Sequence, residues 1–150
     1  MKRRAFLGIA AVSALGVMMT RVAAAEPAVE VYKSPTCGCC GKWADHLRTN
    51  GFTVRINEVQ DTAAVRARAG MPVALASCHT ALVGGYVLEG HVPAADIRRL
   101  LAERPKALGL AAPGMPPGSP GMDLRHAPAW DVLLVQTGGA SRVYHAYPAT

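Results

Sequence analysis

The sequence has few charged residues, few cysteines and no apolar run long enough to span a membrane. Only 17% of its 150 residues are charged, whereas 51% are apolar, which excludes a highly charged disordered chain. Four cysteines are too few for a dense disulfide scaffold, although they suffice for a metal or redox site. The uncharged run from Ala5 to Met19 is shorter than the about 20 residues of a membrane-spanning helix. The length fits one ordinary domain.

Residues 1–25 have the features of an export signal. A basic start is followed by the apolar run and then by Ala23-Ala24-Ala25, the small-residue pattern that a signal peptidase cleaves. The segment Arg3-Arg4-Ala5-Phe6-Leu7 resembles a twin-arginine export signal. We therefore predict a periplasmic protein, cleaved after Ala25, with a single domain over residues 26–150. An uncleaved anchor and the ordinary secretory route remain alternatives.

The predicted cleavage changes the charge argument. The whole chain carries a net charge of +6, which would suggest nucleic acid as a partner. Residues 1–25 contain four basic residues and no acidic one, so residues 26–150 carry only +2. We therefore expect no nucleic-acid partner, and membrane contact only during export. All four cysteines remain in the exported part, where free thiol pairs tend to oxidise unless a metal protects them.

The remaining sequence predicts an α/β fold. Alternating or buried apolar patterns predict strands near residues 29–32, 52–57, 73–77, 81–83 and 86–88, and helical spacing predicts helices near 40–50, 61–69 and 93–104. This order is typical of a thioredoxin-like mixed sheet flanked by helices. Residues 112–128 contain five prolines and three glycines and predict an irregular loop. Residues 131–136 and 142–147, joined across Gly138-Gly139, predict a C-terminal β-hairpin.

Three of the four cysteines lie within the segment Cys37-Gly38-Cys39-Cys40, between a predicted strand and a predicted helix. Cys37 and Cys40 have the C-x-x-C spacing, and the helix N-terminus favours their thiolate forms. A dithiol oxidoreductase needs only two sulfurs, and Cys39 would compete for the mixed disulfide. Thiolates can bridge metal ions, and soft thiolate sites select Cu(I), zinc or iron–sulfur centres. The usual zinc spacing is absent.

Cys78 follows the strand predicted over residues 73–77 and would supply a fourth sulfur. In a thioredoxin-like sheet the C-x-x-C turn faces a proline before this strand, so Pro72 is a candidate for a cis peptide bond. Whether Cys78 reaches the other cysteines depends on the bend between Pro72 and Cys78. Two alternatives remain: structural disulfides, of which Cys37–Cys40 is the most favourable, and a buried apolar role for Cys78.

Five segments together resemble one family, the CopG-like proteins. The segments are Tyr32–Trp43 (YKSPTCGCCGKW), Ser77–Ala81 (SCHTA), Gly90–Ala94 (GHVPA), Pro113–Pro116 (PGMP) and Gly118–Met122 (GSPGM). The resemblance implies an exported thioredoxin-like protein linked to bacterial copper resistance, with copper ions that share bridging cysteine sulfurs. It implies Cys37, Cys39, Cys40 and Cys78 as the metal ligands. It does not imply a thiol oxidoreductase.

Secondary candidates are two histidines and two methionines. His79 could be a ligand or a hydrogen-bond donor to one, whereas His91 is placed to cap a helix. Met115 and Met122 are soft donors for Cu(I) in the proline-glycine loop, or apolar filler. His46 is expected to face solvent.

These residues predict a copper-binding protein that favours Cu(I) over zinc and has copper ions as its partners. Its role would be to buffer, store or redox-process the metal. A thiol–disulfide oxidoreductase that uses Cys37 and Cys40 is the alternative. A third hypothesis is delivery of copper to another exported copper-handling protein.

Overall fold

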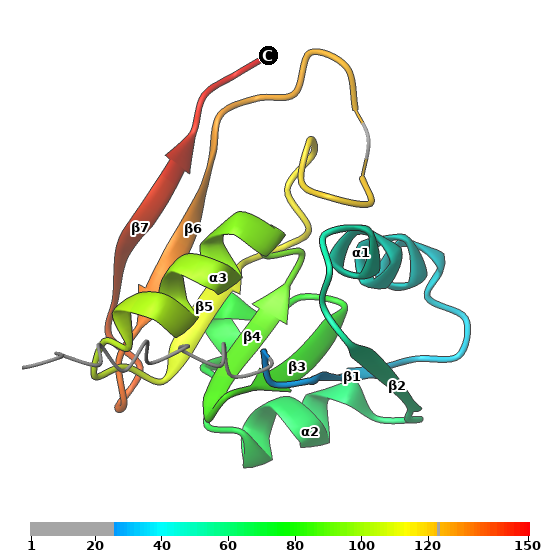
Figure 1. Ribbon diagram of the computed structural model, residues 1–150, viewed down its shortest axis with the longest axis vertical. Coiled ribbons are helices and arrows are strands. Elements are labelled where there is room, and N and C mark those ends of the chain that lie inside the picture. The colour runs from blue at the N-terminus through cyan, green and yellow to red at the C-terminus, as the bar shows by residue number, and fades with distance from the viewer. Residues whose placement is uncertain (1–25, 123) are drawn as a thin grey trace, which may run out of the picture.

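The computed structural model describes residues 26–122 and 124–150, so the predicted export signal lies outside the described residues. Within these described residues, seven strands and three α-helices follow one another (Figure 1). They are β1 (Val29–Lys33), α1 (Gly38–Thr49), β2 (Val54–Glu58), α2 (Thr62–Arg68), β3 (His79–Val83), β4 (Tyr86–Gly90), α3 (Ala94–Glu103), β5 (Gly109–Ala112), β6 (Trp130–Val135) and β7 (Ser141–Tyr147).

The strands form one mixed sheet in the order β2-β1-β3-β4-β5-β6-β7. The first four strands reproduce the thioredoxin-like core that the sequence predicts, because β1 pairs parallel with β2 and antiparallel with β3, and β3 pairs antiparallel with β4. A glycine turn joins the strands predicted over residues 81–83 and 86–88, with positive φ at Gly84 and Gly85. The predicted α/β fold class is therefore confirmed.

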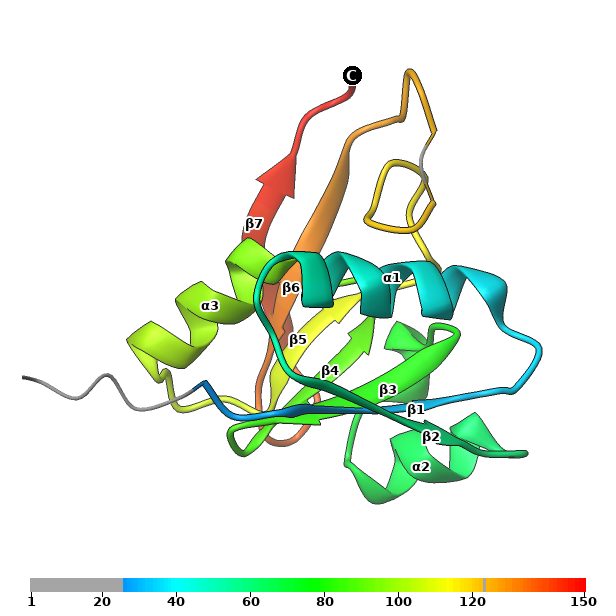
Figure 2. The same ribbon diagram turned by 45° about the vertical axis from the view of Figure 1, so that its right-hand side comes forward.

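Helices cover both faces of the sheet. Helices α1 and α3 lie on one face, and α2 lies on the other (Figure 2). The larger core joins Trp43 and Leu47 of α1 to Val31, Ala81 and Leu88 of the sheet. A smaller core on the α2 side is built on Met71, Val87, Ala111 and Val135. The helical spacing of Trp43 and Leu47 thus records which side of α1 faces the sheet.

The sheet extends beyond the core through β5 and the β6–β7 hairpin. The predicted hairpin is confirmed, and Gly138 and Gly139 adopt positive φ in its turn. Strand β5 was not predicted, because its four residues lie between a helix and the proline-glycine loop and have little β-forming character. It pairs parallel with β4 and antiparallel with β6, so it links the hairpin to the core.

The strand predicted over residues 73–77 is wrong. Val73–Leu75 form a 3-10 turn, Val73 is 83% exposed, and the strand begins only at His79. The peptide bond before Pro72 is trans, so its prediction as a cis bond is also wrong. The apolar run resembles a buried strand because its composition alone does not distinguish a strand from a turn that is packed on one side.

No helix in residues 26–122 and 124–150 combines the length and the apolar character needed to cross a membrane.

Candidate metal centre

Strand pairing brings Cys78 to the start of α1. Strand β1 runs directly into the turn before Cys37, whose N–H donates to the Ser34 carbonyl (3.1 Å). Strand β3 runs antiparallel to β1 with His79 opposite Lys33, so the residue before His79 lies where β1 ends. Cys37 is the N-cap of α1, and Cys39 and Cys40 occupy its first turn. The chain between Pro72 and Cys78, whose course the sequence left open, therefore brings Cys78 next to the other three cysteines.

The four cysteine sulfur atoms all lie within 4.8 Å of one another. Cys37 and Cys40 are joined by a disulfide, whereas Cys39 and Cys78 are free. The Cys39 sulfur is 3.5 Å from that of Cys37, and the Cys40 sulfur is 3.9 Å from the Cys78 carbonyl oxygen. The structure thus brings together the complete sulfur set, with one pair in its oxidised form.

The free thiol of Cys78 is in a poorly solvated position. Burial, reinforced by the nearby Cys39 thiol, raises the pKa of Cys78 to about 12. Cys78 is therefore protonated at neutral pH in the metal-free protein. A metal ion that binds its sulfur must displace this proton, as is general for cysteine ligands.

His79 and His91 both lie beside Cys78. Their Nδ1 and Nε2 atoms, respectively, are 3.4 and 3.3 Å from the Cys78 sulfur. Both side chains are buried, and the His79 ring packs against Trp43 with 4.3 Å between ring centroids. Burial lowers the pKa of His91 and, together with the nearby His91, lowers the pKa of His79 to about 3. Both imidazoles are therefore neutral near pH 7, the form that can bind a metal.

The proline-glycine loop packs on the first turn of α1. The Met115 sulfur is 3.9 Å from that of Cys39, while Met122 lies in a turn closed by its N–H and the Ser119 carbonyl (2.9 Å). Across residues 26–122 and 124–150, no cysteine thiol donates a hydrogen bond to the Met122 sulfur. A Cβ at Gly121 would lie only 2.9 Å from the Cys39 carbonyl oxygen, so a glycine is needed where the loop meets the helix.

His46 is partly buried, contrary to the expectation that it faces solvent. Its Nε2 atom accepts a hydrogen bond from the Ala94 N–H (3.2 Å) at the start of α3. The helical pattern of α1 alone could not show this contact, because α3 comes from a distant part of the chain.

A buried ion pair that the sequence did not predict lies beside Cys78. The Arg66 Nε atom donates to the Glu89 carboxylate (2.8 Å), and both side chains are almost completely buried. A signal was present in the sequence, because Glu89 is the one charged residue in the otherwise apolar strand Tyr86–Gly90. Buried charges are rare unless they are paired, so such a residue predicts a partner without naming it.

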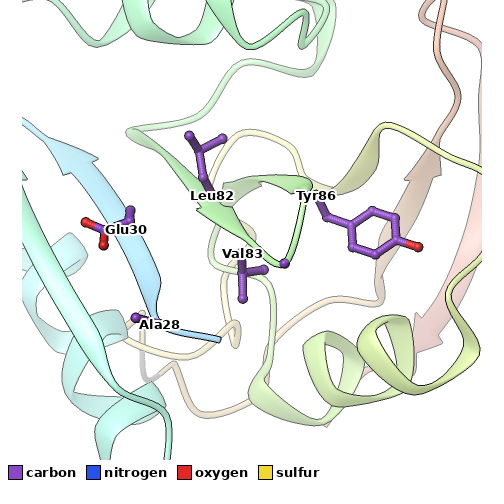
Figure 3. A pocket seen from close by; sticks show the side chains of 7 residues that line it. Ala28, Glu30, Leu82, Val83 and Tyr86 are labelled. Carbon is purple, nitrogen blue, oxygen red and sulfur yellow. The ribbon is translucent and has the colours of Figure 1, made fainter. Parts of the chain in front are cut away.

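A hollow of about 380 Å³ lies at the opposite end of β1 and β3 from the cysteines. Figure 3 shows its lining, which includes Ala28, Glu30, Leu82, Val83 and Tyr86. The Glu30 carboxylate is occupied by Arg55 and Asn57, which hold its pKa below the usual value. The Tyr86 hydroxyl donates to the Pro105 carbonyl (2.8 Å). Both titratable side chains that line this hollow are therefore engaged, so the cysteine cluster is the better candidate site.

Fold and site together define a thioredoxin-like protein whose cysteine cluster is able to hold a metal. Two solved structures match this chain closely. One, described as copper resistance protein CopG form 1, is 42% identical, has a TM-score of 0.78, and spans 83% of this chain and 99% of its own. Form 2 is 43% identical with the same TM-score, and spans 82% of this chain and 99% of its own. The chain therefore belongs to the CopG family.

A family model described as "Protein of unknown function, DUF411" matches residues 75–122, which include Cys78 and the first part of the proline-glycine loop, residues 112–122. No curated protein matches. The resemblance found in the sequence is thus confirmed, and the relatives together with the cysteine cluster support a copper-related function.

Proposed function

We propose that this chain is a periplasmic copper-binding protein that holds Cu(I), or a small copper–thiolate cluster, for copper resistance. The ligands are Cys37, Cys39, Cys40 and Cys78. The observation that carries the proposal is the convergence of their four sulfur atoms within 4.8 Å, from two segments that are distant in the sequence. The copper-resistance relatives support copper as the metal.

The donor set fits a soft ion. Sulfur ligands favour Cu(I), whereas Mg²⁺ and Ca²⁺ prefer oxygen ligands. In the part of the chain that the structure describes, the side chains grouped closely enough to hold a metal are the four cysteines and the set of Cys78 with His79 and His91, and neither group includes a carboxylate. A third sulfur beside the C-x-x-C pair allows Cys39 to bridge two ions. His79, His91 and Met115 are placed to add donors at the edges of the sulfur set. Met122 is left out of the proposed donor set, because no cysteine thiol within residues 26–122 and 124–150 donates a hydrogen bond to its sulfur.

Loading through all four sulfurs requires the Cys37–Cys40 disulfide to be reduced. A dithiol reductant can do this by exchange: the S–S bond breaks, two electrons and two protons pass to the cysteines, and the reductant leaves as a disulfide. Copper ions then displace protons from the thiols. The oxidised pair withholds two of the four ligands, so the redox state of this pair limits how much copper the protein holds.

The decisive experiment is metal analysis of protein purified anaerobically from the periplasm of copper-fed cells. We expect copper bound to the wild-type protein and fewer copper ions per chain in Cys39→Ser. Met122→Leu is the matched control, because it removes a sulfur from the neighbouring loop and should leave the copper content unchanged. One zinc per chain, or no metal, would contradict the proposal. Unchanged copper in Cys39→Ser would contradict the bridging role.

Export is the part of the proposal that rests on residues 1–25. The N-terminal sequence of the periplasmic protein should begin at Glu26. Replacement of Arg3 and Arg4 by lysines should block export if the twin-arginine route is used. A mature protein that still begins at Met1 would contradict cleavage.

A second candidate function, thiol–disulfide oxidoreductase, is favoured by the Cys37–Cys40 disulfide at the N-terminus of α1. It predicts insulin reduction by the metal-free protein and little loss of this activity in Cys39→Ser. Delivery of copper to another exported copper-handling protein would instead appear as transfer that is faster than release of copper to a chelator.

A further inference from the structure

The Glu89 carboxylate is completely buried and accepts hydrogen bonds from three donors. Besides Arg66 (2.8 Å), these are the Ser77 N–H (2.6 Å) and the Thr80 hydroxyl (2.7 Å). Thr80 lies opposite Glu89 in the β3–β4 register, so their side chains share one face of the sheet. Two of these donor residues, Ser77 and Thr80, lie on either side of Cys78 and His79 in the sequence.

Arg66 completes the same arrangement from α2. Its Nη2 atom donates to the Ser77 carbonyl (2.8 Å), which belongs to the peptide bond that joins Ser77 to Cys78. Both main-chain polar groups of Ser77 are therefore bonded to the ion pair: the N–H to Glu89 and the carbonyl to Arg66. The guanidinium fork allows Arg66 to contact the carboxylate and the carbonyl at the same time.

The segment before β3 has little other support from the sheet. The pairing of β3 with β1 begins at His79, one residue after Cys78. Cys37, Cys39 and Cys40, by contrast, belong to the cap and first turn of α1. The Ser77 side chain also packs directly against Gly90, where there is no room for a side chain: a Cβ at residue 90 would lie 2.5 Å from the Ser77 hydroxyl oxygen. The Gly114 N–H also donates to the Ala76 carbonyl (3.2 Å). The ion pair, however, binds the residue directly before Cys78, the one cysteine that α1 does not hold.

We propose that the Arg66–Glu89 ion pair is a positioning element that fixes Cys78 against the three cysteines of α1. The metal part of this inference rests on the proposed copper function. Arg66 and Glu89 do not touch the metal themselves. They set the distance between the Cys78 sulfur and the three cysteine sulfurs at the start of α1. Loss of the ion pair therefore misplaces one ligand while the other three remain in position.

The test uses Glu89→Gln, which keeps the size of the side chain and removes its charge. Asp96→Asn is the matched control, because Asp96 is also a buried carboxylate with two donors, His145 and Tyr147, but none from the Cys78 segment. The first measurement needs no copper. Metal-free, reduced protein is alkylated, and the rate at Cys78 is divided by the rate at Cys39 within the same molecules by peptide mass spectrometry.

We expect the Cys78-to-Cys39 rate ratio to rise severalfold in Glu89→Gln and to stay at the wild-type value in Asp96→Asn. The second measurement is copper retention against a Cu(I) chelator. Loss of a residue that orients a ligand typically weakens metal binding about 10- to 100-fold, and we expect this range for Glu89→Gln. Asp96→Asn should retain copper as the wild type does, although its unfolding midpoint falls.

Wild-type alkylation ratio and copper retention in folded Glu89→Gln would overturn the proposal. If Glu89→Gln does not fold, Arg66→Lys decides, since lysine keeps the charge but cannot hold the carboxylate and the Ser77 carbonyl with one fork. An unchanged ratio in folded Arg66→Lys would overturn the proposal, and a raised ratio would support it. If the wild type holds no copper, the proposed function fails, while the alkylation ratio still tests the positioning role.

Discussion

Glu89 and Asp96 are two buried carboxylates that connect different parts of the molecule. Glu89 is paired with the buried guanidinium of Arg66 and bonded to the chain on both sides of Cys78. Asp96, on α3, accepts from His145 and Tyr147 of β7 at 2.7 Å each, so it attaches the C-terminal hairpin to the core. Glu89 therefore contacts the segment that carries a candidate metal ligand, whereas Asp96 joins two elements of the fold away from the cysteines.

The charge of the partner makes the two carboxylates unequal in energy. Arg66 is charged and buried, so removal of Glu89 leaves an unpaired charge in the interior. The His145 side chain is 43% exposed, so removal of Asp96 leaves partners that water can reach. Removal of a buried carboxylate therefore costs more stability where its partner is a buried charge than where its partners can reach water.

The largest effect is expected from Glu89→Ala. Breaking a buried ion pair by removing one partner costs about 3–5 kcal/mol, whereas Asp96→Ala should cost about 1–3 kcal/mol for its lost hydrogen bonds. Urea denaturation of both metal-free variants measures the difference. Equal losses would show that the burial of Arg66 has no energetic consequence.

A second prediction concerns two glycines with positive φ on β4 and its turn. A Cβ at Gly90 would lie 2.6 Å from the Ala112 carbonyl oxygen as well as close to Ser77, whereas one at Gly85 would meet nothing within 4 Å. Gly85→Ala should cost only about 1–2 kcal/mol of backbone strain. Gly90→Ala should cost more, measured as the free energy of unfolding, and should also lower copper retention. Equal unfolding costs would contradict the close packing at Gly90.

A third prediction is a pH dependence of the metal-free protein. The pKa of His79 is about 3 in the folded protein and 6.5 in the unfolded chain. Between these two pH values His79 is neutral when the protein is folded and takes up a proton when it unfolds. The contribution of neutral His79 to the free energy of unfolding is therefore fully present above pH 6.5 and is lost as the pH falls towards 3. Between pH 6.5 and 5 the free energy of unfolding falls by about 2 kcal/mol for this reason.

His79→Phe should reduce this pH slope while keeping an aromatic ring against Trp43. Urea midpoints at pH 7 and 5 for the wild type and the variant provide the measurement. A slope that persists unchanged in His79→Phe would assign the effect to other groups.

The smallest effect is expected at the edge of the sulfur set. Met115→Leu replaces a thioether 3.9 Å from the Cys39 sulfur by a similar apolar volume, so stability should change by less than about 1.5 kcal/mol. Copper retention against a chelator should fall modestly if the thioether is a donor. Met122→Leu is its control, and an equal effect of both variants would remove Met115 from the ligand set.

Much of the fold follows from local pattern. Helical spacing over residues 40–50 and 61–69 predicts α1 and α2, and the apolar runs 81–83 and 86–88 predict β3 and β4. Asp61, the first residue of the second predicted helix, caps α2 by accepting from the Ala64 N–H (3.0 Å). Each of these signals acts over a few residues. The strand predicted over residues 73–77 failed because an apolar run does not by itself specify a strand.

The sequence by itself determined the order of the core elements, the C-x-C-C segment at a helix start and the resemblance to the CopG family, because these depend on residues that are neighbours in the chain. Only the tertiary structure decided that Cys78 joins the other sulfurs, that His79 and His91 are buried beside it, and that Arg66 is the partner of Glu89. The physical reason is strand register: the antiparallel pairing of β1 with β3 places Cys78 at the end of β1, and no local pattern encodes that pairing.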